Sequence, residues 1–401
     1  MCAERSGDDR GCIRDMLDAC SLDAADAAHG RGGRILRTGT DGNLTARAAL
    51  FEHIGWRVRN ALLGEVYATP KPGLVDRRDT GAHCDMNYET FLASTEAITP
   101  FMVRMFAEGM DATVAGHTPE EVFQEIRGIG LEAERAMYAA TAGVNTHKGM
   151  IFTMGIVLAA AGILYVRREE TAEWPVDDDV TPEALAAADV QVTPETGVIA
   201  GQITVDAILD RTRQMTARSM AEDFRKMLEH PPKTHGERLF QTYGERGIRG
   251  QAMEGFPILR DTAVPWLRRF QNIGTDAELQ HDISVRATLR RGLLQDTGSM
   301  HAEHFENAVH VSTLIAIMSV LNDTNVFIRS SYEDMCWLQA ESSTILGMGA
   351  MFTEEGVRAI EALNMACIEK NISPGGAADI LAVAILLLKL TEDADAGSTG
   401  C

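Results

Sequence analysis

The sequence predicts an all-α protein, a single helical domain with loops at the helix junctions. Ala, Leu, Met and Gly are plentiful, with 19 Met and 36 Gly in 401 residues, whereas aromatic residues make up only 6%. This balance favours packed helices over β-sandwiches, whose faces need β-branched and aromatic side chains. Apolar residues recur at helical spacing along most of the chain, and no alternating strand pattern competes with them.

The helical pattern begins after residues 1–44, which are rich in Gly, Asp and Arg and indicate a flexible lead-in. From Thr45 an apolar residue recurs every fourth position, which predicts an amphipathic helix that ends before Pro70. A second helix is expected from Thr118 towards Ala142, because Thr118, Pro119 and Glu121 have the order of an N-cap, a first-turn proline and a capping box.

The most apolar segment is Met150–Val166, which is seventeen residues long and contains Gly155 and Gly162. This length is at the short limit for a membrane span, and small residues suit close helix packing. We therefore expect a buried core helix rather than a membrane span.

The stretch 167–195 is polar and broken by prolines, so it is predicted to be an exposed insertion. Beyond it, further helices are expected over 196–228, 276–294, 309–321, 332–348, 354–369 and 377–390. The resulting division is a lead-in (1–44), a helical domain (45–392) and a C-terminal tail (393–401). No fixed repeat of a solenoid is present.

Charge and cysteine content exclude several classes. Lys and Arg number 37 and Asp and Glu 58, so the net charge of −21 argues against binding to nucleic acid or to an anionic membrane. Any phosphate ligand must therefore meet a local basic cluster. The seven cysteines are scattered without a CxxC pair, so neither a disulfide framework nor a thiolate zinc site is signalled, and a reduced cytoplasm is the expected compartment. The N-terminus lacks the apolar stretch of a secretory signal.

Two neighbouring helix junctions hold the first candidate site residues. In TPKPGLVD, residues 69–76, two prolines stiffen the chain around Lys71, which is placed to meet phosphate. The GAHCDM motif, residues 81–86, adds His83 and Asp85 to Asp76 and Asp79, a group suited to acid–base chemistry or to magnesium. Each motif has a plain alternative, a proline–glycine linker for the first and capping or surface roles for the second.

Three later junctions offer basic or oxygen ligands. NTHKG, residues 145–149, puts His147 and Lys148 at a helix N-terminus, where polyphosphate is favoured. The glycine-rich stretch 234–257 contains Arg249, although it is not a Walker loop. The last junction has two parts, DTN (residues 323–325) with Arg329, and NISPGGAAD (residues 371–379). Asp323 is suited to bind a hard cation, and residues 373–376 could form an anion-binding turn. Capping or a solvated loop is the alternative at each.

Residues 60–390 contain six unusual motifs: TPKPGLVD, GAHCDM, NTHKGMIF, THG with YGERGIRGQAMEGFP, DTN and NISPGGAAD. Their joint occurrence gives the chain a resemblance to the triphosphoribosyl-dephospho-CoA synthase family. The resemblance implies active-site loops at the helix junctions. It also implies transfer of the triphosphoribosyl group of ATP to the 2′-hydroxyl of 3′-dephospho-CoA, with release of adenine. The product is the precursor of the prosthetic group on the acyl carrier subunit of citrate lyase or malonate decarboxylase.

The resemblance suggests roles for the candidate residues. Asp76 or Asp85 would activate the hydroxyl with help from His83, while Asp79 and Asp323 would hold Mg2+. The triphosphate would be bound by the basic residues Lys71, His147, Lys148, Arg249 and Arg329. The chain departs from the family pattern at Gln251, Ala377 and residues 327–331, where only Arg329 of a histidine–arginine–glycine stretch is kept.

Two other functions remain open from the sequence. One is a different transferase or hydrolase of a nucleotide N-glycosidic bond, and the other is a helical accessory protein that binds nucleotide without turnover. The sequence also leaves open whether the chain forms a homo-oligomer.

Overall fold

The computed structural model describes residues 42–171, 203–273, 281 and 299–391, and in these ranges it contains helices and no strand. The predicted all-α class is confirmed. The helices are α2 (Gly42–Tyr67), α3 (Tyr88–Val114), α4 (Pro119–Ala140), α5 (Lys148–Thr171), α7 (Val205–Met227), α8 (His235–Tyr243), α9 (Gly247–Met253), α10 (Val264–Gln271), α12 (Ser299–Met318), α13 (Thr324–Arg329), α14 (Tyr332–Gly347), α15 (Glu354–Glu369) and α16 (Gly375–Thr391), with a π-helical turn at Leu259–Ala263 and a 3-10 turn at Ala350–Phe352.

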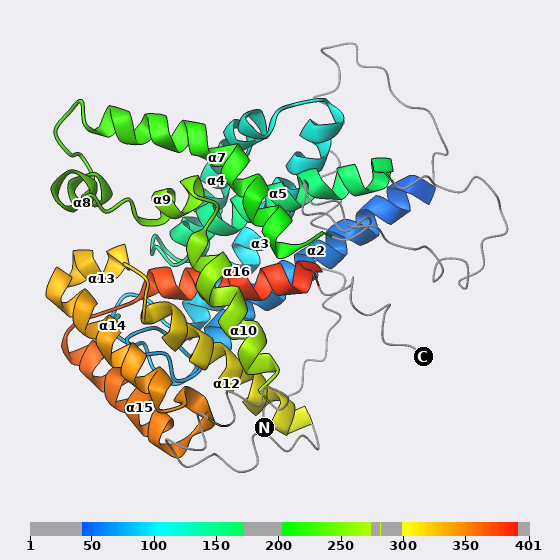
Figure 1. Cartoon of the computed structure of the whole chain (residues 1–401). Coiled ribbons are helices and arrows are strands. Elements are labelled where there is room, and N and C mark those ends of the chain that lie inside the picture. The colour runs from blue at the N-terminus through cyan, green and yellow to red at the C-terminus, as the bar shows by residue number, and fades with distance from the viewer. Residues whose placement is uncertain (1–41, 172–202, 274–280, 282–298, 392–401) are drawn as a thin grey trace.

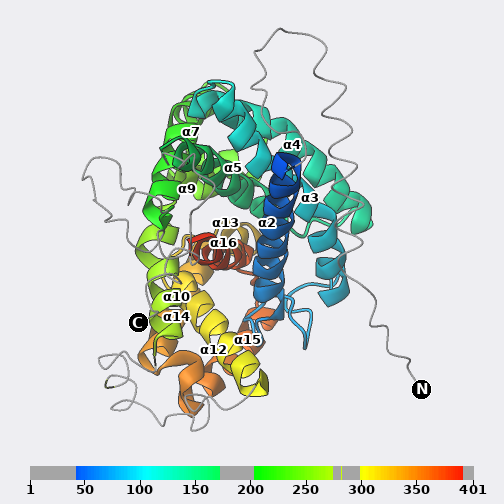
Figure 2. The same ribbon diagram turned by 90° about the vertical axis from the view of Figure 1, so that its right-hand side faces the viewer.

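Helix α16 runs through the centre of the molecule (Figure 1). Helices α3, α4, α5 and α7 lie on one side of it, and α10, α12, α14 and α15 lie on the other, as the nearly end-on view of α16 in Figure 2 shows. Its residues 380–388 are all buried. A helix that is apolar on every side belongs in a core, which explains why the last predicted helix takes the central position.

Helix α5 is the second core helix, and its residues Lys148–Val166 are long and apolar enough to cross a membrane by length and composition. Within the protein, however, 83% of this window is buried. It packs most extensively against α3. A methyl group on Gly162 would overlap the backbone oxygen of Phe106, so the small residue is needed for this close packing. The expected buried core helix is confirmed.

Most predicted helices are observed with small shifts at their ends, but α12 begins at Ser299 instead of the expected 309, and α7 begins at Val205 instead of 196. The capping box at Thr118 and Glu121 is present, and α15 has the predicted bounds. Helix α5 continues to Thr171, beyond the expected end at Val166. The lead-in up to residue 41, the rest of the insertion (172–195), the helix expected over 276–294 apart from His281, and the tail 393–401 lie outside the described residues.

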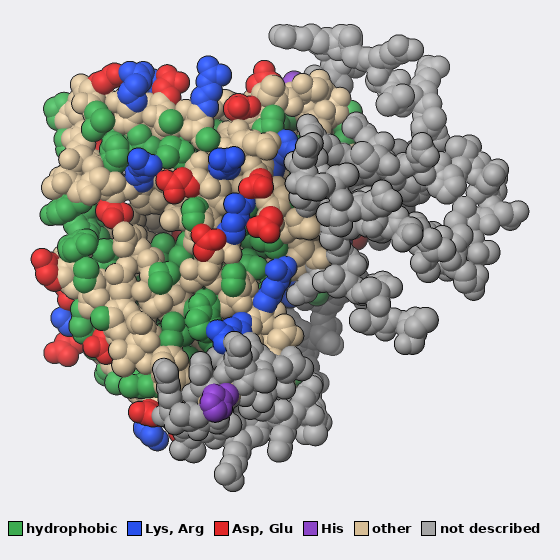
Figure 3. Space-filling view, in the orientation of Figure 1, with side chains coloured by type: hydrophobic (Ala, Val, Ile, Leu, Met, Phe, Trp, Pro, Cys, Tyr) green, Lys and Arg blue, Asp and Glu red, His purple; other side chains and the backbone are tan. Residues whose placement is uncertain are grey.

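Several parts of the chain contain helices that the sequence pattern did not predict, and the short helices α10 and α13 are among them. Helix α3 spans Tyr88–Val114 and includes Pro100. The glycine-rich stretch 234–257, interpreted from the sequence as a helix junction, forms the short helices α8 and α9. On the face drawn in Figure 3, acidic and basic side chains are interspersed rather than gathered into one patch. A basic phosphate site must therefore be sought at the helix junctions.

Candidate active site

One cavity lies where the C-terminal end of α2, the first turns of α5 and α16, and helix α13 meet. Its volume is about 320 Å3. The lining residues come from the stretches 65–75, 83–91, 145–150, 325–329 and 373–379. Segments that are more than 300 residues apart in sequence therefore surround one space.

Six of the predicted site residues line this cavity, namely Lys71, His83, Asp85, His147, Lys148 and Arg329. The other four, Asp76, Asp79, Arg249 and Asp323, are not among its lining residues. The junctions at 69–86, 144–149 and 371–379 thus meet, and Arg329 joins them from α13.

Lys71 is buried in an ion pair with Glu65, the last acidic residue of α2. Its Nζ donates to Oε1 of Glu65 at 2.5 Å and to the backbone oxygen of Glu65 at 3.0 Å. Both side chains are at most 3% exposed. An ammonium group has three N–H donors, so one remains for a ligand in the cavity. Lys71 is therefore fixed in a buried ion pair, and it is not the solvated lysine of an ordinary linker.

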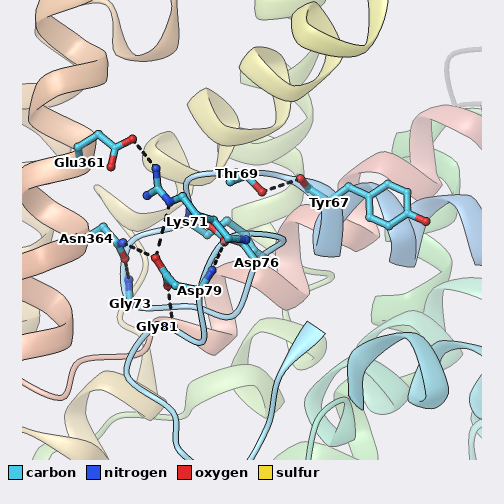
Figure 4. Close-up of polar contacts among 10 residues, drawn as sticks. Tyr67, Thr69, Lys71, Gly73, Asp76, Asp79, Gly81, Glu361 and Asn364 are labelled. Atoms are coloured by element: carbon cyan, nitrogen blue, oxygen red, sulfur yellow. Dashed lines mark hydrogen bonds and ion pairs between the residues drawn. The ribbon is translucent and has the colours of Figure 1, made fainter. Parts of the chain in front are cut away.

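Asp76 and Asp79 brace the loop that carries Lys71 (Figure 4). The carboxylate of Asp76 accepts from the backbone N–H groups of Lys71, Arg78 and Asp79 at 3.0, 2.7 and 3.1 Å. Asp79 accepts from the Gly81 N–H at 2.8 Å and from the side-chain amide of Asn364 on α15 at 3.2 Å. These contacts use the oxygens of both carboxylates to fix the backbone.

His83 is largely enclosed and lies between Ser373 and Asp85. Its Nε2 is 2.7 Å from the Ser373 hydroxyl, and its Nδ1 is 3.6 Å from Oδ1 of Asp85. Burial and the Arg329 guanidinium lower the pKa of His83, and the Asp85 carboxylate opposes this shift. The imidazole is thus held in its neutral form near pH 7 and can accept a proton. The Asp85 side chain is 59% exposed at this edge of the cavity.

Arg329 connects three segments of the site. Its Nη2 donates to the Ala82 backbone oxygen at 2.6 Å and to Oδ1 of Asn371 at 2.8 Å. In the described part of the chain, none of its hydrogen-bond partners is a carboxylate. The guanidinium therefore keeps its full positive charge while it positions the loop that carries His83.

His147 is fully buried beside the start of α5. Its Nδ1 is 2.6 Å from the Ser94 hydroxyl, and its ring meets that of Phe91 edge-on at 5.1 Å. Nε2 has no hydrogen-bond partner. Burial, with a contribution from the Lys71 charge, lowers the pKa of His147 to about 3. It is therefore a neutral imidazole in the cavity wall rather than a cation that attracts phosphate.

Lys148 is the most accessible cation of the cavity, with a side chain that is 54% exposed. Its Nζ lies 2.9 Å from Oε2 of Glu134. This hydrogen bond raises the pKa of Lys148, and the nearby Arg249 charge opposes the rise. Arg249, on α9, is exposed. A second guanidinium therefore lies close to Lys148, although it is not part of the cavity wall.

The magnesium ligands expected from the sequence do not form one site. Asp323 is buried, and its carboxylate accepts from the Asn325 N–H at 2.9 Å and the Ala377 N–H at 3.0 Å, which joins α13 to α16. Burial raises the pKa of Asp323 to about 6. Asp79 is bonded elsewhere, to Asn364. In the described parts of the chain, no three His, Cys, Asp or Glu side chains gather in a metal-binding arrangement.

Sequence reasoning missed Glu65 and Asp379, two of the three carboxyl groups that line the cavity. Asp379 is the fifth residue of α16, and it faces the cavity beside Gly149 at the start of α5. Burial and the charges of Glu65 and Asp323 raise the pKa of Asp379 well above its usual range. The signal was present in the sequence, because Asp379 is the one acidic residue in the apolar segment 375–391.

A second cavity of about 420 Å3 lies on the other side of the first turn of α16. Gly376 and Ile380 line it, whereas Gly375 and Asp379 line the first cavity. Its wall combines aliphatic side chains with the amide of Gln251 and with Arg246, which is paired with Glu254 at 3.3 Å. This cavity is less basic than the first.

A cavity that combines basic side chains with carboxyl and imidazole groups is typical of an enzyme acting on an anionic substrate. A family model described as ATP:dephospho-CoA triphosphoribosyl transferase matches residues 51–291 and 284–398. The chain therefore belongs to the ATP:dephospho-CoA triphosphoribosyl transferase family, and it is a transferase.

Known relatives cover most of the chain. A Vibrio cholerae serotype O1 protein named probable 2-(5''-triphosphoribosyl)-3'-dephosphocoenzyme-A synthase is 30% identical over 341 residues, 84% of this chain and 88% of the relative. A protein of the same name from Streptococcus equi subsp. equi is 31% identical over 337 residues, 84% of this chain and 96% of the relative. Protein CitXG of Haemophilus influenzae is 31% identical over 340 residues, 84% of this chain and 60% of the relative. No solved structure matches the chain.

Proposed function

We propose that this protein transfers the triphosphoribosyl group of ATP to the 2′-hydroxyl of 3′-dephospho-CoA and releases adenine. The observation that carries the proposal is the meeting of Lys71, Lys148 and Arg329 with His83 and Asp85 around one cavity. These residues come from the same motifs on which the family resemblance rests. Cations beside a proton acceptor are what a polyphosphate-bearing glycosyl donor requires.

The reaction makes one bond and breaks one. The acceptor 2′-oxygen bonds to C1′ of the ATP ribose, and the bond from C1′ to N9 of adenine breaks. The hydroxyl loses a proton and the purine gains one, so the net reaction needs no oxidant or reductant. The triphosphate is retained, and positive charge develops on the ribose in the transition state.

His83 is placed to take the hydroxyl proton. Its pKa is lowered, so the ring is neutral near pH 7, and Asp85 at 3.6 Å would stabilise the imidazolium that forms. Asp76 is not assigned this role, because its carboxylate accepts three backbone N–H groups.

Lys148 and Arg329 would hold the triphosphate, together with the free N–H of Lys71 and with Arg249 at the side of the cavity. Among the described residues, Arg329 has no carboxylate as a hydrogen-bond partner, so its charge is available to phosphate. A strongly acidic chain, with a net charge of −21, would then attract its anionic substrate only here.

Magnesium is assigned to the substrate and not to a resident site. The predicted ligands Asp79 and Asp323 are bonded to different segments, so the donor set does not fit one ion. Mg2+ would therefore arrive as the counter-ion of ATP.

The first cavity, at about 320 Å3, is at the low end of the range for small-molecule sites, and two nucleotide-sized substrates need more room. We assign the part of the substrates that does not fit the first cavity to the second cavity, of about 420 Å3, across the first turn of α16. The product would serve a carrier subunit of citrate lyase or malonate decarboxylase, and the reaction would take place in the cytoplasm.

The test is to incubate the purified protein with ATP, magnesium and dephospho-CoA and to analyse the products by mass spectrometry. Free adenine and a triphosphoribosyl adduct are expected in equal amounts, and both should disappear when dephospho-CoA is omitted. Adenine release without the acceptor would indicate a hydrolase. Formation of ADP or pyrophosphate in place of adenine would refute the proposed reaction.

The Asp85→Asn variant tests the proton-handling edge of the cavity. The Asp85 side chain is 59% exposed, so the helical fold should be unchanged. Loss of the carboxylate beside His83 should reduce adenine release by roughly 100-fold or more, the scale of general acid–base contributions. Full activity would remove Asp85 from the mechanism.

A further inference from the structure

Asp379 has an environment that no other carboxyl group lining the first cavity shares. It faces the cavity from α16, and its carboxylate lies against Gly149 at the start of α5, where any side chain would overlap it. In the described part of the chain, no residue donates a hydrogen bond to its oxygens. Asp379 thus has its carboxyl group at the first cavity, and this group is not engaged with any described residue in a hydrogen bond that would stabilise the fold.

The charges around Asp379 also separate it from Asp85. Glu65 from α2 and Asp323 from the cap of α13 are the charged groups that act on it directly. Lys71 lines the same cavity but is bonded to Glu65, and Lys148 is bonded to Glu134. His147, at the start of α5, is neutral. Among the described residues no cation is bonded to Asp379, so burial and two acidic neighbours both favour its protonated form.

We propose that Asp379 is the general acid of the transfer reaction, and that its carboxyl group gives its proton to the departing adenine. This inference rests on the proposed function, and it identifies the group that protonates the leaving purine. As the C1′–N9 bond breaks, the electron pair goes to the purine, and the proton of Asp379 goes to N7 of the ring. His83 meanwhile takes the proton of the 2′-hydroxyl, and exchange with water returns both groups to their starting states.

Two carboxyl groups in different environments then serve two roles, which is the pattern by which acid and base are told apart in glycosyl-transfer sites. Asp85 is 59% exposed and lies 3.6 Å from His83, which suits a group that stabilises the imidazolium. Asp379 is partly buried at the start of α16, and the charge of Glu65 acts on it, which suits an acid. Asp379 and His83 line the same cavity, as the acid and the base of one glycosyl transfer must.

The test compares Asp379→Asn with the wild type on two donors, ATP and its N7-methylated analogue, whose base leaves without needing a proton. An amide has nearly the shape of a protonated carboxyl group, so the variant should fold and bind ATP. Adenine release from ATP should fall by roughly 100- to 10,000-fold, the range of a general acid. The rate at which Asp379→Asn releases the methylated base should stay within about tenfold of the wild-type rate.

Asp111→Asn is the matched control, because Asp111 is exposed, pairs with Arg47, and is absent from both cavities. It should behave as the wild type with both donors. Equal losses with ATP and with the methylated analogue in Asp379→Asn would overturn the general-acid role. Wild-type protein that releases no adenine from ATP and dephospho-CoA would instead refute the proposed function.

A measurement without turnover tests the same residue. Carbon NMR of the wild type, compared with Asp379→Asn, should contain one carboxyl resonance that is lost in the variant and titrates well above the usual range for aspartate. A midpoint in the ordinary range would contradict the proposal even if the variant were inactive.

Discussion

Lys71 and Glu65 form a buried ion pair at the wall of the first cavity, with 2.5 Å between Nζ and Oε1. The pair links the end of α2 to the loop 69–81, and Asp379 is close enough to Glu65 for their charges to interact. The ion pair thus lies between the Lys71 loop, which the sequence analysis identified as a candidate site, and Asp379, which it did not identify.

Removal of one partner of this pair should be more costly than removal of both. Lys71→Met leaves a buried carboxylate without a partner, which should lower the free energy of unfolding by about 3–5 kcal/mol. The double variant Glu65→Leu with Lys71→Met should be more stable than Lys71→Met alone, because it leaves no unpaired charge. Urea unfolding of both single variants and the double variant measures the coupling; additive effects would show that the pair is not coupled.

The sequence predicted the helices with strong periodicity and clear caps, and it failed where local signals conflict with tertiary packing. The capping box of Thr118 and Glu121 set the start of α4, and the bounds of α15 were predicted without error. Helix α3 was missed because Pro100 interrupts its pattern. The glycines of 244–255 likewise hid the short helix α9.

For the site, the motifs were predictable and the role of each side chain was not. Spacing identified the loops that meet, but it could not tell that the oxygens of Asp76 are taken by backbone N–H groups. Nor could it tell that Asp323 is bonded to the start of α16 while Asp79 is bonded to α15. Which carboxyl group is free depends on contacts between segments distant in sequence, and that is how Asp379 was overlooked.

Gly149→Ala should displace Asp379 from its position. Alanine is favoured over glycine inside a helix by about 1 kcal/mol, but here its methyl group would overlap Oδ2 of Asp379. We expect lower adenine release with a normal circular dichroism spectrum. The control is Gly128→Ala in α4, where no atom lies within 4 Å of an added Cβ, so stability should rise and activity should be unchanged. Wild-type turnover in Gly149→Ala would argue against the need for this contact.

His147 should make the stability depend on pH on the acidic side. Its pKa is about 3 in the folded protein, because burial disfavours the charged ring, and 6.5 is the ordinary value. The unfolded chain therefore binds the extra proton first, and stability present above pH 6.5 is lost as the pH falls towards 3. Between pH 7 and pH 5 the loss from this residue is about 2 kcal/mol.

The comparison is with His147→Asn, which keeps a polar atom near Ser94 Oγ but cannot titrate in this range. Its free energy of unfolding should fall less than that of the wild type over the same pH interval, by about 2 kcal/mol. His310, whose pKa is also lowered by burial, to about 4, is present in both proteins and cancels in the difference. Parallel pH profiles would show that His147 is not buried in its neutral form.

Arg329 should contribute to nucleotide binding through both charge and loop position. Its guanidinium donates to the Ala82 oxygen at 2.6 Å and to Asn371 at 2.8 Å, and so holds the His83 loop against the start of α16. Arg329→Ala removes these bonds, and loss of hydrogen bonds from a charged group costs about 1.5–3 kcal/mol, so ATP affinity by calorimetry should fall roughly 10- to 100-fold. Arg329→Lys should recover little, because an ammonium cannot reproduce the planar guanidinium whose Nε and Nη2 both donate to Asn371. Arg358→Ala on the exposed face of α15, where Arg358 is 72% exposed, controls for the loss of one positive charge and should bind ATP as the wild type does. Unchanged affinity in Arg329→Ala would separate this arginine from the phosphate site and leave it as a brace between the two loops.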